Sequence, residues 1–158
     1  MTVKKYSLKK SGNIHLSPHF TVKEFASHDG ADTVLIDMLL IEYLEKIRQH
    51  FGKPIHINSG YRTAKYNAKS GGVSNSYHVK GMAADIVAQG VPSKRIAQYA
   101  ETLGCGGIGW YEGKKFVHID TRKNRVCWKD AGSNVCKTFS DCPYAEPSEN
   151  QKFGDKGA

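Results

Sequence analysis

The chain is organised around S-Y-H-V-K-G-M-A-A-D, which runs over Ser76–Asp85, and around F-V-H-I-D, which runs over Phe116–Asp120. The first stretch holds a His and an Asp seven residues apart, and the second adds a His in an alternating, strand-like run. Two imidazoles and one carboxylate are the ligand set of a catalytic zinc site, in which three protein ligands leave the fourth tetrahedral position open. We therefore predict that His78, Asp85 and His118 bind one metal ion.

Asp85 supports this prediction because it lies in Met82–Ala88, a strand-like run that is otherwise apolar. Burying an ionised carboxylate is costly unless the group is paired or bound to a cation. Taken singly, His78 would be a water-satisfied loop histidine and His118 a buried sheet histidine. Together with Asp85 they favour a metal, and the small residues around them let the backbone approach an ion closely: Gly81, Ala83 and Ala84. This ligand set suits Zn²⁺ best, although Co²⁺, Ni²⁺ or Mn²⁺ could occupy it in vitro.

The pattern S-x-H-x-x-G-x-A-x-D, preceded by S-G-Y-R-T at 59–63 and followed by the distal His118, resembles the zinc D-Ala-D-Ala carboxypeptidase family. That family includes VanY-like enzymes, phage endolysin peptidases and the hedgehog signalling domain. The resemblance covers Leu16 to Arg122, and it implies the same three metal ligands. It also implies a zinc peptidase whose substrate is a peptidoglycan stem peptide.

Three further residues are implied to contact the substrate. Arg62 matches the family's arginine that faces the substrate's carbonyl or terminal carboxylate, which a planar guanidinium binds through two hydrogen bonds. The alternative for Arg62 is an exposed charge that serves solubility only. Ser76 and Tyr77 would lie beside the metal and contact the peptide. Tyr61 and Trp110 would line either the cleft or the core.

The general base is predicted from the resemblance to be Glu112, six residues before His118, as in hedgehog-like members. Many carboxypeptidases of the family instead have a His two residues before the distal ligand, where this chain has Phe116. Asp120 is the second candidate. In the predicted mechanism Glu112 accepts a proton from the water that zinc activates, and Arg62 helps to stabilise the oxyanion.

The periodicities predict an α+β fold with a small antiparallel sheet that carries Asp85 and His118 in its middle. Helices back this sheet, and the zinc cleft opens on its other face. A core helix over 32–51 is predicted to be capped by Asp32 and ended by Gly52. The other predicted elements are a capping box at 21–24, strands at 55–58 and 82–88, helices at 64–69 and 92–103, and a hairpin of 107–111 with 116–120.

With 158 residues the chain is predicted to form one domain. Residues 1–14 are expected to be a mobile basic arm or an edge strand, 15–125 the peptidase domain, and 126–158 a partly disordered tail. The cysteines are not arranged as C-x-x-C pairs, which argues against a structural zinc site: Cys105, Cys127, Cys136 and Cys142. A disulfide between two of the last three and reduced thiols remain equal alternatives.

The net charge of +8 favours polyanionic partners such as a cell-wall polymer, but no nucleic-acid motif is present and nucleic acid is not an expected partner. No apolar run is long enough to span a membrane. The amino terminus has no apolar segment typical of a signal peptide. We expect a monomer made in a bacterial or phage-infected cytoplasm, acting at the cell wall if released or exported.

The sequence therefore predicts a zinc metallopeptidase that hydrolyses peptidoglycan stem peptides, as a D,D-carboxypeptidase or as an endolysin-type endopeptidase. One alternative is a catalytically inactive zinc-binding module that recognises the cell wall, which the Phe116 departure favours. A basic cell-wall or nucleic-acid binder with incidental zinc is a third reading, but it leaves Asp85 unexplained.

Overall fold

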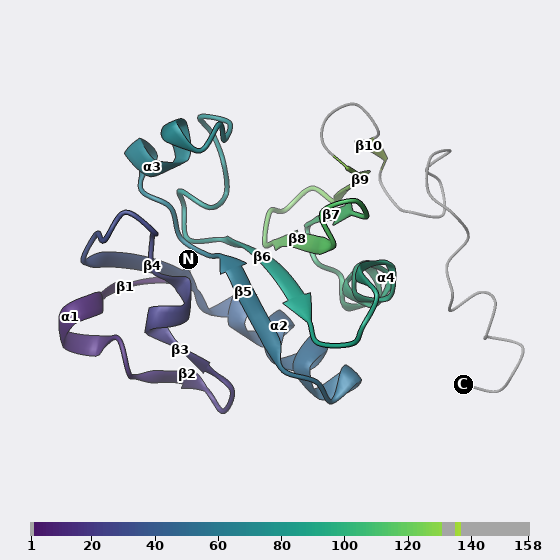
Figure 1. The fold of residues 1–158 in the computed structure, drawn as a ribbon, viewed down its shortest axis with the longest axis horizontal. Coiled ribbons are helices and arrows are strands. Elements are labelled where there is room, and N and C mark those ends of the chain that lie inside the picture. Colours follow the sequence, from purple (N-terminus) through teal and green to yellow (C-terminus); the bar gives the residue numbers. More distant parts are fainter. Residues whose placement is uncertain (1, 131–134, 137–158) are drawn as a thin grey trace, which may run out of the picture.

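The computed structural model describes residues 2–130 and 135–136, and its centre is a six-stranded sheet with strand order β10-β9-β7-β8-β6-β5 (Figure 1). The strands are β5 Ile55–Ser59, β6 Ala83–Ala88, β7 Gly107–Tyr111, β8 Phe116–Asp120, β9 Val126–Lys129 and β10 Val135–Cys136. Neighbours are antiparallel except β7 and β9, which run parallel. The prediction of an α+β domain is confirmed, and its purely antiparallel sheet is corrected to a mixed one.

The two strands that carry the predicted ligands lie side by side in the interior of this sheet. β6 pairs with β8, and Asp85 lies directly opposite His118 in the register. The predicted hairpin is confirmed, because β7 and β8 pair antiparallel around the turn at 112–115. Directly opposed residues on antiparallel strands have their side chains on the same face, so the register alone brings these two ligands together.

Three α-helices of more than one turn accompany the sheet: α2 Met38–Phe51, α3 Ala64–Lys69 and α4 Ser93–Leu103. Helix α4 packs on β6, β7 and β8, whereas α2 packs on α4 and on the amino-terminal strands. Their apolar faces join the buried side of the sheet in one core that includes Leu44, Ile86, Ile96 and Val117. Helix α3 follows the carboxyl end of β5 and lies beyond the edge of the sheet (Figure 1).

The core helix begins six residues later than predicted, at Met38. Residues Thr33–Asp37 form strand β4, with Val34 and Ile36 buried, because alternating apolar residues suit a half-buried strand. Asp37 caps α2, since its carboxylate accepts a hydrogen bond from the amide of Leu39 at 3.0 Å. Asp32 instead accepts from the amide of Lys9 at 2.8 Å. The helix ends as predicted, with Gly52 in the left-handed conformation at φ 62°.

The amino-terminal residues are built into the fold rather than forming a mobile arm. Strand β1, Val3–Ser7, pairs antiparallel with β4 along its whole length, and the one-turn helix α1, Leu8–Ser11, follows it. A second small pair is formed by β2, His15–Ser17, and β3, Phe20–Thr21. The predicted capping box is confirmed, because Glu24 accepts from the amide of Thr21 at 2.6 Å. It caps the 3₁₀ helix η1, Val22–Phe25.

Strand β9 shows that the sheet continues past the predicted domain boundary at residue 125. Cys127 is fully buried, and β9 pairs with β7 through all four of its residues. The thiol of Cys105 is also buried, and burial raises its pKa to about 12. Cys142 and the side chain of Cys136 lie outside the described residues, so the disulfide alternatives stay predictions. Among the described residues, no helix is both long and apolar enough to cross a membrane.

Candidate metal centre

His78, Asp85 and His118 converge as predicted. Oδ1 of Asp85 lies 3.3 Å from Nε2 of His78 and 3.0 Å from Nδ1 of His118. One possible ligand atom from each residue lies within 4.8 Å of the other two, and all three residues are buried. β6 supplies Asp85, β8 supplies His118, and the loop before β6 supplies His78.

Hydrogen bonds on the far side of each imidazole fix which nitrogen faces Asp85. Nδ1 of His78 lies 2.7 Å from the carbonyl oxygen of Gly60, which can only accept, so Nδ1 carries a proton and Nε2 has a free lone pair. Nε2 of His118 lies 2.8 Å from Oδ2 of Asp120. This carboxylate likewise holds a proton on Nε2 and turns Nδ1 towards Asp85.

The convergence calls for a cation, because the neutral rings would aim two nitrogen lone pairs at a carboxylate oxygen. Burial opposes the charged form of Asp85, yet its close contacts with His118 and His78 hold its pKa well below the usual range. Burial also lowers the pKa of His118, but the hydrogen bonds to Asp120 and Asp85 outweigh it and raise that pKa to about 9. A proton can supply the positive charge, and a divalent metal would take its place. The donor set therefore fits Zn²⁺.

Arg62 reaches this centre from the loop after β5. Its Nη2 donates to Oδ2 of Asp85 at 3.3 Å, the oxygen that does not face the imidazoles. Its other two nitrogens donate to Oγ of Ser59 at 2.9 Å and to Oδ1 of Asn67 at 3.3 Å. All three guanidinium nitrogens are thus engaged within the protein, and Arg62 orients Asp85.

The loop that carries His78 also carries the two predicted substrate-contacting residues. Ser76 is buried and its hydroxyl accepts from the amide of His78 at 3.2 Å, so it shapes this loop. Tyr77 lies at the surface of the cleft. Gly81 closes the loop at φ 75°, and its carbonyl accepts from the amide of Asp37 at 2.8 Å. A side chain on Gly81 would meet the carbonyl oxygen of Leu35 at 2.5 Å, so the close approach of this loop to β4 requires glycine.

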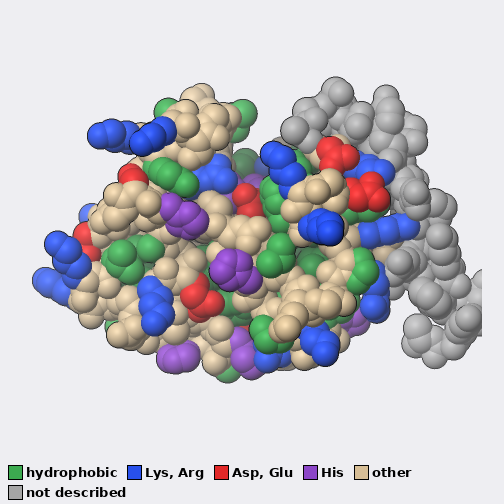
Figure 2. All heavy atoms as spheres, viewed as in Figure 1, with side chains coloured by type: hydrophobic (Ala, Val, Ile, Leu, Met, Phe, Trp, Pro, Cys, Tyr) green, Lys and Arg blue, Asp and Glu red, His purple; other side chains and the backbone are tan. Residues whose placement is uncertain are grey.

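A cleft of about 520 Å³ opens over the three ligands, between the α3 side and the β7–β9 side of the surface (Figure 2). One wall is the loop after α3, with Gly72, Val73 and Asn75, and the other is formed mainly by aromatic and basic side chains: Tyr111, Lys114, Phe116, Arg122 and Trp128. Arg62, Ser76 and Tyr77 also line it, as predicted. Trp110 does not, because it is buried in the core, and Tyr61 packs against that core.

The structure does not bring either predicted base to the cleft surface. Glu112 is at the hairpin turn with 61% of its side chain exposed, and its carboxylate lies 3.3 Å from Nζ of Lys129. Asp120 is fully buried behind His118 and also accepts from the guanidinium of Arg122, at 2.6 Å from Nη2. Among the described residues that line the cleft, Asp85 is the one carboxylate.

The aromatic wall was not foreseen from the sequence, and Trp128 holds it together. Nε1 of Trp128 donates to the hydroxyl of Tyr111 at 2.9 Å, and the indole lies 5.1 Å from the imidazole of His118 between ring centres. Tyr111 in turn stacks on Phe116 at 4.4 Å. The sequence feature that could have predicted it is the short run V-C-W-K at 126–129, whose residues suit a β-strand. The run is short and polar residues surround it, so no strand was predicted there.

Glycines in β7 make room for this arrangement. Gly109 lies between His118 on β8 and Trp128 on β9, and a Cβ there would come within 2.5 Å of the indole. A Cβ on Gly107 would come within 2.1 Å of the carboxylate of Asp120. The two bare positions on β7 leave room for the ring of Trp128, which reaches His118 from β9, and for the carboxylate of Asp120, which contacts His118 along β8 itself.

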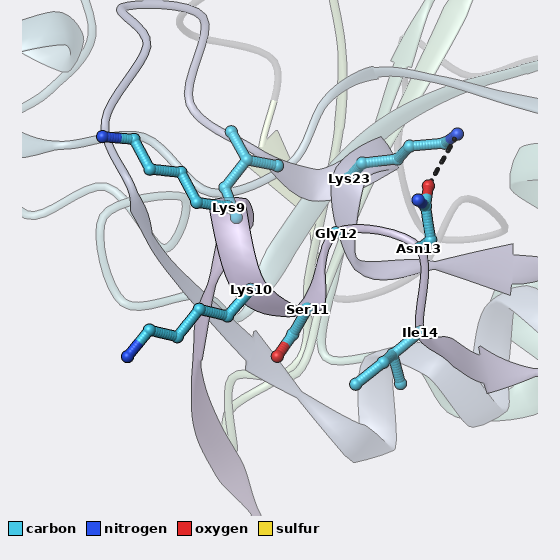
Figure 3. A pocket seen from close by; sticks show the side chains of 8 residues that line it. Lys9, Lys10, Ser11, Gly12, Asn13, Ile14 and Lys23 are labelled. Carbon is cyan, nitrogen blue, oxygen red and sulfur yellow. Dashed lines mark hydrogen bonds between the residues drawn. The ribbon is translucent and has the colours of Figure 1, made fainter.

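A second hollow, around α1, carries basic side chains but does not form a comparable centre (Figure 3). Lys9 and Lys10 extend away from it, and Nζ of Lys23 donates to Oδ1 of Asn13 at 3.2 Å. Asp32, which accepts from the amide of the lining residue Lys9, also accepts from the hydroxyl of Ser7.

Comparison with known proteins agrees with the centre just described. Residues 18–120 match the model of the family described as Peptidase M15, which spans both ligand-bearing strands and most of the chain. The chain belongs to the peptidase M15 family. Its relatives include the probable peptidoglycan L,D-endopeptidase MepK of Haemophilus influenzae, 44% identical over 80 residues, covering 48% of this chain and 42% of that protein.

The peptidoglycan L,D-endopeptidase MepK of Escherichia coli K12 is 39% identical over 93 residues, covering 54% of this chain and 51% of that protein. The chain thus matches about half the length of these curated relatives. M15 peptidases generally depend on zinc, and the ligand cluster of this member suits that metal.

Proposed function

We propose that the protein is a zinc-dependent endopeptidase that cleaves peptide bonds in peptidoglycan. The observation that carries the proposal is the convergence of two tautomer-fixed histidines and Asp85 at the floor of an open cleft. Two relatives named as peptidoglycan L,D-endopeptidases support the substrate and favour an endopeptidase over a D,D-carboxypeptidase.

Zinc, when bound, would lower the pKa of a water molecule and polarise the scissile carbonyl. The chain's own residues orient the ligands and stabilise developing charge. Asp120 keeps Nδ1 of His118 free for the metal, and Gly60 does the same for Nε2 of His78. Arg62 holds the second oxygen of Asp85 and adds positive charge beside the position where an oxyanion would develop.

Tyr111 is positioned to donate a hydrogen bond to the substrate. Its hydroxyl oxygen accepts from Trp128, so its own proton is free to point into the cleft. Burial raises the pKa of Tyr111, which keeps the phenol protonated at neutral pH. A neutral donor at the cleft wall can stabilise a carbonyl oxygen as it becomes negative.

The decisive experiment offers the purified protein three substrates: a stem pentapeptide ending in D-Ala-D-Ala, a dimer joined by a D,D cross-link and a dimer joined by an L,D cross-link. Release of monomers from a dimer identifies an endopeptidase, and release of D-Ala alone identifies a carboxypeptidase. Chelation should abolish the reaction and zinc should restore it. His118→Ala, which removes one ligand, is the matched inactive control.

Within residues 2–130, the cleft lining holds no second carboxylate beside Asp85, which favours one other function, a zinc-binding module that recognises the cell wall without cleaving it. That module would bind peptidoglycan sacculi in a zinc-dependent manner and leave all three substrates intact.

A further inference from the structure

Arg122 is the cleft-lining residue whose arrangement is least explained by metal binding. It follows β8 by two positions, and its guanidinium lies 4.4 Å from the centre of the Tyr77 ring and 5.3 Å from that of Trp128. Stacking on two rings immobilises the planar group at the cleft wall. A long side chain fixed in this way has lost its rotamer freedom before any ligand binds, which lowers the cost of binding.

The hydrogen bonds of Arg122 leave part of the guanidinium available. Of its five N–H groups, Nε donates to Asp120 at 2.9 Å and Nη2 donates to the same carboxylate at 2.6 Å. Within the described part of the chain, Nη1 has no hydrogen-bond partner. The side chain is 22% exposed and lines the cleft, and Nη1 lies away from the Nε–Nη2 edge that Asp120 occupies.

Arg62 is less suited to the same task. Each of its three nitrogens already donates, to Ser59, to Asn67 and to Asp85. An incoming anion would compete with the carboxylate that orients the metal centre. Arg122 offers a nitrogen without such competition, because its own carboxylate partner, Asp120, is fully buried on the opposite edge.

The charge of the cleft points to an anionic ligand. In the part of the chain that the structure describes, its lining holds three cationic side chains, Arg62, Lys114 and Arg122, against the single carboxylate of Asp85. A bound divalent metal would add to the positive side. A carboxylate suits a guanidinium edge through charge-assisted hydrogen bonds, whereas a carboxamide presents N–H donors of its own to those of the arginine.

We propose that Arg122 is a specificity-determining residue that binds a free carboxylate of the peptide near the scissile bond. The inference rests on the proposed function and narrows its substrate class to stem peptides whose acidic residue keeps its α-carboxylate. Peptides in which that group is a carboxamide are poor substrates. The residue acts through binding, so its effect falls mainly on KM.

The test compares two stem-peptide dimers, joined by the same L,D cross-link, that differ only in this group, with γ-linked D-glutamate as the free acid in one and as the α-carboxamide in the other. The wild-type protein should prefer the acid by about tenfold or more in kcat/KM, since hydrogen bonds to charged groups are among the stronger ones. Arg122→Gln should reduce this preference to about one. Lys123→Gln, the same charge change at the neighbouring exposed residue, is the matched control and should keep the preference.

A role limited to holding Asp120 predicts a different pattern. Arg122→Gln would then slow both peptides equally and lower the zinc content while the preference persisted, which would overturn the proposal. Equal rates for both peptides with the wild-type protein would overturn it as well. Arg122→Lys, which keeps the charge but not the fork, provides a second variant if the glutamine variant does not fold, and should give a weakened preference.

Binding measured by calorimetry separates this inference from the proposed function. If the wild-type protein cleaves neither peptide, the proposed endopeptidase activity fails. The Arg122 inference then still requires tighter binding of the acid than of the amide, and loss of that difference in Arg122→Gln. Equal binding of the two peptides would reject it.

Discussion

At the scale of single residues, the carboxylates around His118 have different tasks. Asp85 faces the same point as the two imidazoles, while Asp120 is behind His118 and fixes its tautomer. Such outer partners of ligating histidines affect metal affinity without contacting the metal. The motif spacing was sufficient to predict that His78, Asp85 and His118 come together, because a metal site needs a fixed set of residue types. It could not show where Glu112 lies, since a turn residue can face either side of a hairpin.

Substitutions of the two predicted bases, Glu112 and Asp120, should therefore differ in their effects on turnover and on zinc affinity. We expect Glu112→Gln to keep turnover within about threefold of the wild type, since general-base loss would cost at least about 100-fold. Asp120→Asn should weaken zinc binding about 10- to 100-fold. Steady-state kinetics with metal analysis of each variant measures both effects. A Glu112→Gln variant that holds zinc but is inactive would show that Glu112 leaves Lys129 and acts in the cleft.

The pKa of His118 sets the pH dependence of zinc binding. This pKa is raised to about 9 in the metal-free protein, so at neutral pH a proton occupies the position that the metal requires. The proton competes below pH 9 and not above it, so apparent zinc affinity should fall by about tenfold per pH unit as pH decreases from 9. Competition titrations with a chelator between pH 6.5 and 9.5 measure this slope. A constant affinity between pH 7 and 9 would contradict the raised pKa.

At the scale of elements, strand β7 connects the metal centre to the aromatic wall. Gly109 faces both His118 and Trp128, and no side chain separates them. The hairpin was predictable because apolar alternation flanks a polar turn of four residues. The parallel addition of β9 was not, because nothing local in the sequence specifies which edge a distant strand will join.

Gly109→Ala should displace the indole of Trp128, since the new methyl group would lie 2.5 Å from it. We expect turnover to fall about tenfold or more, because Tyr111 loses its hydrogen bond from Trp128, while zinc content stays near that of the wild type. Turnover and tryptophan fluorescence report the two effects. Gly113→Ala in the turn of the same hairpin is the control, because a Cβ there meets nothing within 4 Å. If both substitutions change turnover and fluorescence equally, the space that Gly109 leaves for the indole of Trp128 is not needed for activity.

At the scale of the whole molecule, the sheet joins parts of the chain that the sequence suggested were separate. The first strand pairs with β4, and β9 completes the cleft wall beyond the family match at 18–120. The polar composition after Arg125 favoured a loose tail, yet Cys127 is completely buried. The composition of a segment predicts only its average solvent exposure. A strand of four residues changes that average too little to be recognised in a polar segment.

A chain ending at residue 125 therefore tests whether the peptidase domain ends where the sequence suggested. It lacks β9, so it exposes the edge of β7, removes the buried Cys127 and deletes Trp128 from above His118. The deletion thus removes a fully buried side chain together with the pairing of four strand residues, and domains of this size are stable by only about 5–15 kcal/mol. We expect a clearly lower Tm and little turnover, measured by thermal unfolding and by peptide hydrolysis against the full chain.

A chain ending at residue 136 keeps β9 and β10 and is the matched control. If the two truncated chains unfold at the same temperature and cleave equally well, β9 is not part of the catalytic domain, and Trp128 has no role in the cleft.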